Sequence, residues 1–504
     1  MADAQDGVAN RWEAGERVKL VIEDRRDDAT KDASKDVAAD DDESLAKKIL
    51  GGGIRRSWMQ NATVVFWLMF AINAVNYLDR LVVIAVGPAL KADFNLVDSQ
   101  IGILSSAFIL VYTLAALPCG LLADRFSRTR VITFGVALWS VMSAATAFVR
   151  NFPLLFFTRA MVGVGEASYY PAGSALLGAY YPLKKRARIM SGWQVGQLVG
   201  MVLAFAIVAF LDSIIDPAKE PWRVAFFITG VPGIILAFLI WFVKDQPDVS
   251  VESSEETTEE KATEGEEVGP VGDAHGAALS LSGGFSAMMR SVATVLRIRT
   301  VWVVVSLQAL MFIVVTPAIT FLPIYVHSEN GPFHLKSNAT AIWAGVIIVA
   351  GGVSGLLLGG ALADKMSARF RGGRVLAASL GFGLAIPFYV LALLTSSFPL
   401  FVITAIIAVM ALNIPVGPLV ASLTDATPPL LRATAFAVAL SLAHLLGDVW
   451  APSLVGGIST ALGEHANLAM LIVGLPCLAV ACVAAYFGAR LYSRDVAKQT
   501  RQQV

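Results

Sequence analysis

The sequence predicts an all-α membrane protein with twelve transmembrane helices in two pseudo-symmetric six-helix bundles. Three observations support this prediction: an apolar composition, twelve long apolar stretches, and a short motif that recurs in both halves of the chain. Of the 504 residues, 56% are hydrophobic and only 15% are charged. A soluble protein carries about 25% charged residues. We therefore expect a multi-pass membrane protein.

Each of the twelve apolar stretches is long enough for a helix that crosses the hydrocarbon core, which takes about 20 residues. A polar, acidic segment separates the first six stretches from the last six. The stretches cover residues 62–90, 99–123, 130–150, 153–181, 188–214, 222–243, 300–327, 338–363, 374–397, 399–424, 432–462 and 466–491. This order predicts two bundles of six helices joined by a linker.

The chain divides into five expected regions. These are a cytosolic N-terminal extension at 1–57, a first six-helix bundle at 58–243, an acidic cytosolic linker at 244–299, a second six-helix bundle at 300–492 and a cytosolic tail at 493–504. The extension is polar with mixed charges, which predicts disorder and is unlike a signal or transit peptide. Within the linker, residues 285–299 alternate apolar side chains with arginines. This pattern fits a short amphipathic helix on an anionic membrane surface, or an extended cytosolic start of the seventh helix.

Lysine and arginine are divided unevenly between the two sets of loops. Cytoplasmic loops carry an excess of these residues, so the richer set indicates the cytoplasmic side. The richer set holds Arg125, Arg128, Arg130, Lys184, Lys185, Arg186, Arg188, Lys365, Arg369, Arg371, Arg374 and Arg432. The opposite set holds Lys91, Arg150, Lys219, Arg223 and Lys336. We expect both termini in the cytoplasm and the chain in the plasma (inner) membrane, or in an endolysosomal membrane if the host is a eukaryote.

Charged residues within two of the apolar stretches are candidates for a functional site. Asp79 and Arg80 lie in the first stretch, and Arg159 and Glu166 lie seven residues apart in the fourth. Ionisable side chains in a membrane are costly and normally face the bundle interior or a water-filled path. Adjacent residues point about 100° apart on a helix. We therefore expect a cross-helix pairing of Asp79 or Glu166 with Arg159 or Arg80.

Two interpretations of these four residues stay open. In the first, the carboxylates exchange protons while the guanidinium groups bind an anionic head group, since their fork matches phosphate and carboxylate oxygens. In the second, the residues form static buried ion pairs that only hold helices together. Buried pairs are poor stabilisers, which favours the functional interpretation.

His444 and Asp448 are one turn apart in the eleventh stretch and are expected to face the same way. A histidine in an apolar helix often has only a structural hydrogen bond. The aspartate four residues on makes a place on the substrate or proton path an equal alternative. No third and fourth ligands are spaced to complete a metal site, so we expect no metal here.

A short motif recurs after the second and the eighth stretch. Its first copy runs Gly120-Leu-Leu-Ala-Asp124-Arg125-Phe-Ser-Arg128, and its second copy, 240 residues later, runs Gly360-Ala-Leu-Ala-Asp364-Lys365. Carboxylates on such loops can accept hydrogen bonds from the free N–H groups of a helix N-terminus. Two halves related by an axis along the membrane normal are typical of transporters that bind substrate between the halves.

These loops resemble the signature of the major facilitator superfamily, G-x-x-x-D-(R/K)-x-G-R, with Ser127 where glycine is usual. Three further stretches resemble the Spinster group of lipid transporters within that superfamily. They are residues 76–80, 159–169 and 444–456. The first two are also similar to organic-anion symporters of the sialin and hexuronate type, whereas the third favours Spinster.

The resemblance implies a proton-coupled secondary transporter of a lysolipid or sphingolipid-like amphiphile that works by alternating access. A proton-coupled symporter of an organic anion, a sugar acid or carboxylate, is the alternative. In this superfamily the first motif loop docks on the start of the eleventh helix and closes the cytoplasmic side, and the second loop docks at the corresponding place in the first half. The implied gating residues are Gly120, Asp124, Arg125, Arg128 and Asp364.

Several function classes have no support in the sequence. There is no Walker loop, catalytic triad, zinc spacing or redox motif, so we expect neither an enzyme nor a cofactor. The formal net charge is zero, and nothing suggests a nucleic acid. The expected partners are membrane lipids, a small amphiphilic or anionic substrate and protons, bound by a monomer.

Overall fold

A computed structural model describes residues 61–216, 219–245, 281–328, 331–428 and 431–503. The expected extension at 1–57 and the acidic run of the linker lie outside the described residues. The chain forms two compact units, Met1–Val65 and Phe66–Val504. All contacts discussed below lie within the second unit.

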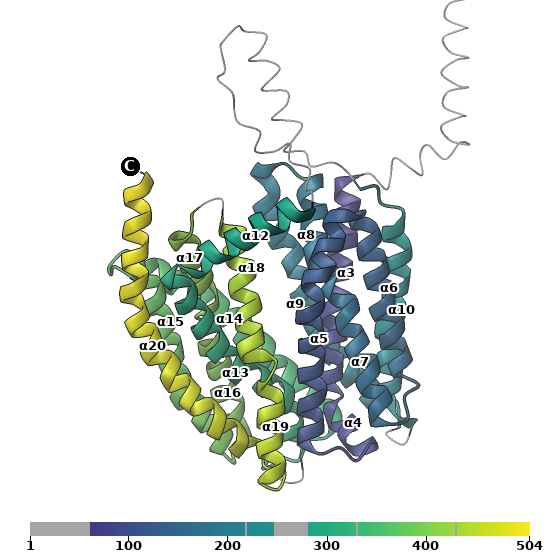
Figure 1. Cartoon of the computed structure of the whole chain (residues 1–504). Helices are drawn as coiled ribbons and strands as arrows, with labels where there is room; N and C mark the ends of the chain where they lie inside the picture. Colours follow the sequence, from purple (N-terminus) through teal and green to yellow (C-terminus); the bar gives the residue numbers. More distant parts are fainter. Residues whose placement is uncertain (1–60, 217–218, 246–280, 329–330, 429–430, 504) are drawn as a thin grey trace, which may run out of the picture. The chain divides into compact units, whose positions relative to one another are not determined.

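Every regular element in the described residues is a helix, which confirms the predicted all-α fold. The first group comprises α3 (Ala62–Ala85), α4 (Gly87–Asp93), α5 (Asp98–Arg125), α6 (Arg128–Thr146), α7 (Phe152–Ala167), α8 (Tyr169–Tyr180), α9 (Leu183–Ile214) and α10 (Pro221–Trp241). The second group comprises α12 (Leu281–Leu296), α13 (Arg299–His327), α14 (Ser337–Ser367), α15 (Gly373–Leu394), α16 (Phe398–Asn413), α17 (Val416–Ala426), α18 (Arg432–Ala443), the π-helix η3 (His444–Asp448), α19 (Ala451–Ala461) and α20 (Ala466–Gln503). Figure 1 shows α3 to α10 on one side and α13 to α20 on the other.

Among the described residues, ten helical segments are long and apolar enough to cross a membrane. The expected third and fourth spans, α6 and the α7–α8 pair, are not among the ten. The fourth span carries Arg159 and Glu166 and is interrupted at Ser168, between α7 and α8. That these two spans also cross the membrane, which would bring the total to twelve, therefore stays a prediction.

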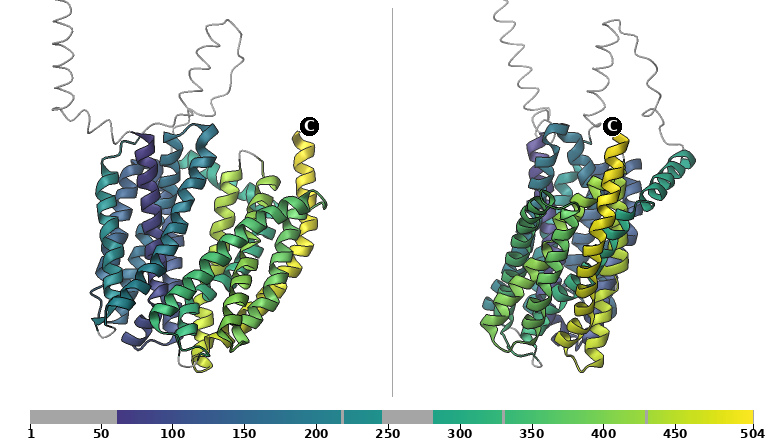
Figure 2. Two further views of the ribbon diagram at one scale, coloured as in Figure 1. Left: turned by 180° about the vertical axis from the view of Figure 1, so that it is seen from behind. Right: turned by 90° about the vertical axis from the view of Figure 1, so that its left-hand side faces the viewer.

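The amphipathic segment of the linker forms a helix of its own, α12. It ends at Leu296, and α13 begins separately at Arg299. Figures 1 and 2 show α12 inclined steeply to the long helices, near the end of the protein that holds the C-terminus. The segment is therefore not a straight extension of the seventh helix.

Glycines bring α7 and α10 close to α6. A Cβ at Gly165 would lie 2.7 Å from the carbonyl oxygen of Gly135, and a Cβ at Gly230 would lie 2.7 Å from that of Ser140. A larger side chain at either position would push the helices apart. Small residues permit such close backbone approach between membrane helices. This packing places polar side chains of α6 next to those of α3 and α10.

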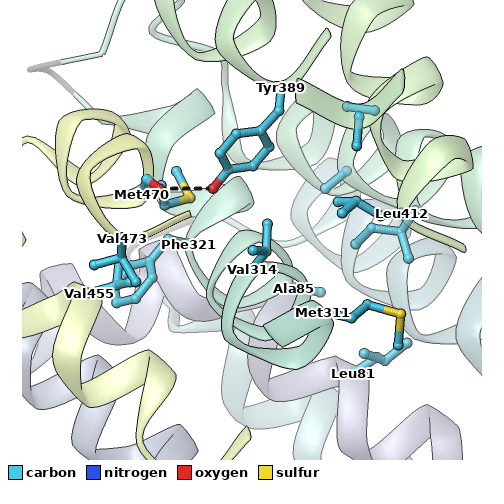
Figure 3. Close-up of a cluster of buried hydrophobic side chains, with 14 of the residues drawn as sticks. Leu81, Ala85, Met311, Val314, Phe321, Tyr389, Leu412, Val455, Met470 and Val473 are labelled. Carbon is cyan, nitrogen blue, oxygen red and sulfur yellow. Dashed lines mark hydrogen bonds between the residues drawn. The ribbon is translucent and has the colours of Figure 1, made fainter. Parts of the chain in front are cut away.

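Apolar side chains from both groups of helices meet around α13. Leu81 and Ala85 of α3 belong to the same buried cluster as Met311 and Val314 of α13. Figure 3 shows these residues together with Tyr389, whose hydroxyl donates to the carbonyl of Met470 at 3.2 Å. The core of the second unit is thus continuous across the two groups of helices.

Candidate functional site

The four charged residues of the first and fourth spans form two ion pairs between α3 and α7. Arg80 Nε lies 2.5 Å from Glu166 Oε2, and Arg159 Nη2 lies 3.6 Å from Asp79 Oδ2. Neighbours on each helix therefore pair with the opposite helix and not with each other. This is the cross-helix arrangement that the sequence led us to expect.

Asp79 and Glu166 are both buried, and neither is exposed to the cavity that lies beside them. Asp79 is 0% exposed and Glu166 is 1% exposed. Arg80 and Arg159 line a cavity of about 200 Å³, and neither carboxylate belongs to its lining. The Arg80 guanidinium also lies 4.5 Å from the ring centre of Tyr112, close enough for a cation–π contact. Each arginine thus stands between a buried carboxylate and the cavity.

Asp448 of η3 reaches the same cavity from the second group of helices. His444 Nδ1 lies 2.7 Å from Asp448 Oδ2, and the hydroxyl of Thr316 donates to Oδ1. The His444 ring stacks on Phe312, with centroids 4.6 Å apart. His444 itself is not part of the cavity lining, so its contact with the site runs through Asp448.

A π-helical turn and a close helix contact set the position of Asp448. The widened turn of η3 spans His444–Asp448, and π-turns of this kind often occur at functional sites. A Cβ at Gly447 would lie 2.9 Å from the Cα of Ala309 on α13. Because glycine allows this approach, the aspartate comes within reach of Thr316 on α13. Sequence reasoning missed Thr316, because hydroxyls are common in apolar helices and carry no distinguishing pattern.

A second cavity, of about 130 Å³, lies among α13 to α16 and α20, with Met201 of α9 at its wall. Its lining is almost wholly apolar and includes Ile348, Tyr389, Phe401 and Leu412. Ile319 of α13 lines both cavities. A mostly apolar cavity that contains three charged side chains and an almost wholly apolar cavity therefore share the lining residue Ile319.

No group of three metal-ligating side chains occurs within the part of the chain that the structure describes. The side-chain contacts described above join His444 and Asp448 to each other, to Thr316 and to Phe312. The place of this pair on a substrate or proton path stays a prediction.

The family model of the Major Facilitator Superfamily matches residues 69–452. The chain belongs to the Major Facilitator Superfamily. This confirms the superfamily that the sequence predicted, which is a superfamily of membrane transporters and not of enzymes.

Curated relatives support this placement. The chain is 25% identical to protein spinster of Drosophila melanogaster over 413 residues, which cover 82% of this chain and 63% of the fly protein. It is 31% identical to protein spinster homolog 1 of Xenopus laevis over 190 residues, covering 37% of this chain and 35% of the frog protein. The matched regions span less than two thirds of both relatives. A probable L-galactonate transporter of Escherichia coli is 30% identical over 181 residues, covering 36% of this chain and 39% of that protein.

Solved structures support the fold. A bacterial homolog of the human lysosomal transporter Spinster, in an inward-facing and unoccupied conformation, matches with a TM-score of 0.68 at 24% identity. The match covers 87% of this chain and 98% of that one. A D-xylose-proton symporter matches with a TM-score of 0.59 at 14% identity, covering 83% of this chain and 96% of that one. The predicted major facilitator fold is thereby confirmed.

The motif loops of this superfamily member lie at the end that holds the C-terminus (Figure 1). Gly120 lies near the end of α5, and the side chains of Asp124 and Arg125 lie outside the described residues. The backbone N–H of Arg128 donates to Asp245 Oδ2 at 2.6 Å, and Arg128 Nη1 donates to the carbonyl of Ala175. These contacts of Arg128 stay within the first group of helices.

The charged residues of the second motif copy, Asp364 and Lys365, are solvent-exposed. Asp364, near the end of α14, is exposed and forms no ion pair with any described residue. Nearby, Arg374 pairs with Asp425, which also accepts from the Tyr492 hydroxyl at 2.6 Å. The gating role of the motif residues stays a prediction.

Polar contacts join the two groups of helices at the opposite end of the transporter. Lys91 Nζ lies 2.5 Å from Asp98 Oδ1 and 2.6 Å from Glu464 Oε2. Asp98 Oδ2 accepts from Ser459, and the N–H of Ser99 donates to Thr460. Sequence reasoning counted Lys91 only as a topology charge and missed this cluster. No local signal joins residues that lie more than 360 positions apart along the chain.

Proposed function

We propose that this transporter moves a single-chain amphiphile, a lysolipid or sphingolipid-like molecule, together with protons by alternating access. The observation that carries the proposal is the pair of adjoining cavities that meet at Ile319. The first offers Arg80, Arg159 and Asp448 to an anionic or zwitterionic head group. The second offers an apolar wall to a tail.

The buried ion pairs supply a route to proton coupling. An anionic head group in the cavity competes with Glu166 and Asp79 for the guanidinium groups of Arg80 and Arg159. A carboxylate that loses its partner in a buried site is costly as a free charge, so it takes up a proton. When the head group leaves, the arginine returns and the proton is released. Substrate binding and proton binding thereby favour each other.

Alternating access is supported by the distribution of contacts. The cluster of Lys91, Asp98 and Glu464 joins the two groups of helices at the end away from the C-terminus. We assign this end to the outer face, because the arginine-rich loops and the termini are expected in the cytoplasm. In this assignment the described state is closed outside. We further propose that the carrier acts as a monomer. Its place is the plasma (inner) membrane, or an endolysosomal membrane if the host is a eukaryote.

A second candidate function is proton-coupled symport of a small organic anion. The similarity to the probable L-galactonate transporter favours it, and the arginines of the first cavity suit a carboxylate equally well. Such a substrate has no tail and makes no use of the apolar cavity.

A chain-length series separates the two candidates. Each buried methylene contributes about 0.8 kcal/mol, or about a fourfold change in affinity. We expect binding of lysophosphatidylethanolamines to purified protein to tighten steeply as the acyl chain lengthens. Flat affinity across the series, together with proton-driven uptake of a sugar acid, would favour the organic-anion function instead.

A matched pair of variants tests the tail cavity. Gly352 lines the apolar cavity, and a Cβ there meets nothing within 4 Å, so Gly352→Leu adds a side chain to the cavity without disturbing the backbone. We expect it to weaken long-chain binding and to spare short chains. Gly457→Leu on α19 is equally unhindered at Cβ and is not part of the cavity lining, so it is the control.

A further inference from the structure

Asp79 has hydrogen-bond partners that the other buried carboxylate lacks. Its Oδ1 accepts from the hydroxyl of Ser143 on α6 and lies 3.3 Å from the hydroxyl of Thr229 on α10. Both hydroxyl residues are buried, at 0% and 1% exposure. Glu166 accepts from Arg80 only, and no hydroxyl among the described residues donates to it.

The two oxygens of Asp79 are therefore unlike each other. Oδ1 is occupied by the hydroxyls. Oδ2 has no hydrogen-bond donor in the described part of the chain and lies 3.6 Å from Arg159 Nη2. Arg159 Nη1 is also buried without an acceptor. Such orphaned buried atoms are rare in native proteins and often indicate a functional exchange of partners or bound water.

The hydroxyl of Ser143 has an acceptor that is unusual for a serine within a helix. A serine or threonine within a helix commonly donates to the carbonyl three or four residues earlier, as Thr146 on the same helix does toward Met142. In the described structure, Ser143 donates to Asp79 instead. Thr229 lies 3.1 Å from the carbonyl of Phe226 as well as 3.3 Å from Asp79, so its single hydrogen is shared. Ser143 is consequently the stronger of the two donors.

Among the described residues, the charged groups around Asp79 come from α3 and α7. Arg159 and Glu166 face it from α7, and Arg80 is its neighbour on α3. The contacts described for Asp79 from α6 and α10 are hydroxyls, Ser143 and Thr229. Hydrogen bonds to a charged carboxylate favour the charged form. The hydroxyl pair therefore acts on the proton affinity of Asp79 without contributing a charge.

We propose that Ser143 and Thr229 are positioning residues for proton coupling at Asp79. They hold Oδ1, and they leave Oδ2 as the atom that exchanges Arg159 for a proton. When Arg159 turns to a bound anion, Oδ2 forms an O–H bond with a proton delivered by water. When Arg159 returns, that bond breaks and the proton goes back to water. This inference rests on the proposed proton coupling.

Infrared titration of the purified full-length transporter tests the inference without any substrate. Protonation of Asp79 is followed by its carboxylic C=O stretching band, which is assigned by its loss in Asp79→Asn. Loss of a hydrogen bond to a charged group corresponds to about one pH unit. We expect the midpoint of this band to move to higher pH by about one unit in Ser143→Ala. A smaller shift is expected in Thr229→Val, because its hydrogen is shared.

The controls separate positioning from general loss of packing. Ser422 and Thr404 are buried hydroxyl residues that donate to carbonyls of their own helices, so Ser422→Ala and Thr404→Val remove matched groups far from Asp79. Both should leave the midpoint unchanged. Ser143→Thr keeps a hydroxyl and should retain the wild-type midpoint. If Ser143→Ala folds poorly, Ser143→Thr and Thr229→Val still test the role of the hydroxyl groups.

One result would contradict the positioning role, and a different result would contradict the proton coupling. An Asp79 band that titrates at the same pH in wild type, Ser143→Ala and Thr229→Val would overturn the positioning role and leave proton coupling intact. An Asp79 band that does not titrate in the wild type at any accessible pH would overturn the coupling on which the inference rests.

Discussion

Glu464, in the loop between α19 and α20, accepts a hydrogen bond from the backbone N–H of Asp98, the first residue of α5, at 3.1 Å. The residue before the helix, Val97, has no side-chain acceptor to cap it. A carboxylate from the second group of helices therefore occupies the positive N-terminus of a helix in the first. Glu464 adopts a left-handed backbone with φ of 67°, and Gly463 before it has φ of 80°. This strained turn directs the carboxylate at α5 and at Lys91.

Substitution of Glu464 should open this end of the transporter. Glu464→Gln removes the negative charge that pairs with Lys91 across the two groups of helices. The Lys91–Asp98 pair lies within the first group and remains. We expect about a tenfold shift toward states that are open at this end, since a charge-assisted hydrogen bond contributes about 1.5 kcal/mol. Electron–electron distances between spin labels at Asn151 and Leu462, with the three native cysteines replaced, would measure it. Glu220→Gln removes a carboxylate just before α10 that pairs with Arg223 of that helix, and it should change nothing.

Three groups of this closure have shifted pKa values. Burial raises the pKa of Asp98 above its usual value, although hydrogen bonds from Lys91 and Ser459 act in the opposite direction. Burial raises the pKa of Glu464, but the hydrogen bond and charge of Lys91 outweigh it and hold the pKa below its usual value. Burial lowers the pKa of Lys91, but hydrogen bonds to Asp98 and Glu464 hold the pKa above its usual value. A lowered carboxylate pKa stabilises closure above the free value of about 4.3, and a raised lysine pKa stabilises closure below about 10.4.

We therefore expect the ion pair of Lys91 and Glu464 to be independent of pH between about 5 and 9, so that any change of closure in weak acid comes from Asp98. The ion pair should weaken in stronger acid, as Glu464 becomes protonated, and in stronger base, as Lys91 loses its proton. The same spin-label distances, recorded across pH in Asp79→Asn/Glu166→Gln protein, would check this without interference from the membrane carboxylates. A midpoint near neutral pH in that protein would contradict the assignment.

A pair of adjacent glycines tests the contact between α5 and α19. A Cβ at Gly456 would clash with the carbonyl of Asp98, whereas a Cβ at Gly457 meets nothing within 4 Å. Gly456→Ala should therefore disfavour the closed state and lower turnover by about tenfold or more, a cost typical of overpacking. Gly457→Ala changes the same helix by the same atoms and should transport normally. Equal turnover in both variants would mean that this contact does not form during the transport cycle.

Neutral versions of the two membrane carboxylates should uncouple transport from protons. Glu166→Gln and Asp79→Asn each keep the shape of the side chain but cannot exchange a proton. We expect proton-driven uptake into liposomes to be abolished while substrate exchange without a gradient continues. Thermal unfolding measures in parallel the cost of leaving Arg80 or Arg159 without its buried partner. If both variants transport with an unchanged pH profile, the two carboxylates are structural ion pairs.

Much of the fold was predictable because helices that cross a membrane need long apolar stretches, which are easy to recognise in a sequence. Apolar stretches of about 20 residues mark helices, and an Asp, Arg or Glu among them stands out against its surroundings. A cross-helix pairing among Asp79, Arg80, Arg159 and Glu166 was expected for this reason, although not which carboxylate meets which arginine. The proximity of His444 to Asp448 was also expected. Two breaks were not expected, at Ser168 and at η3, because local sequence gives little indication of where a helix in a packed bundle will break.

The residues that the sequence could not reveal are the uncharged and the distant ones. Ser143, Thr229 and Thr316 look like any hydroxyl in an apolar helix, and only the packing of α6, α10 and α13 places them on carboxylates. Glu464 lies 366 positions from Asp98, so their contact depends on how the two groups of helices meet. Hydropathy identifies which side chains must leave the lipid. Which partner each of them finds depends on helix packing, and that is a property of the folded chain.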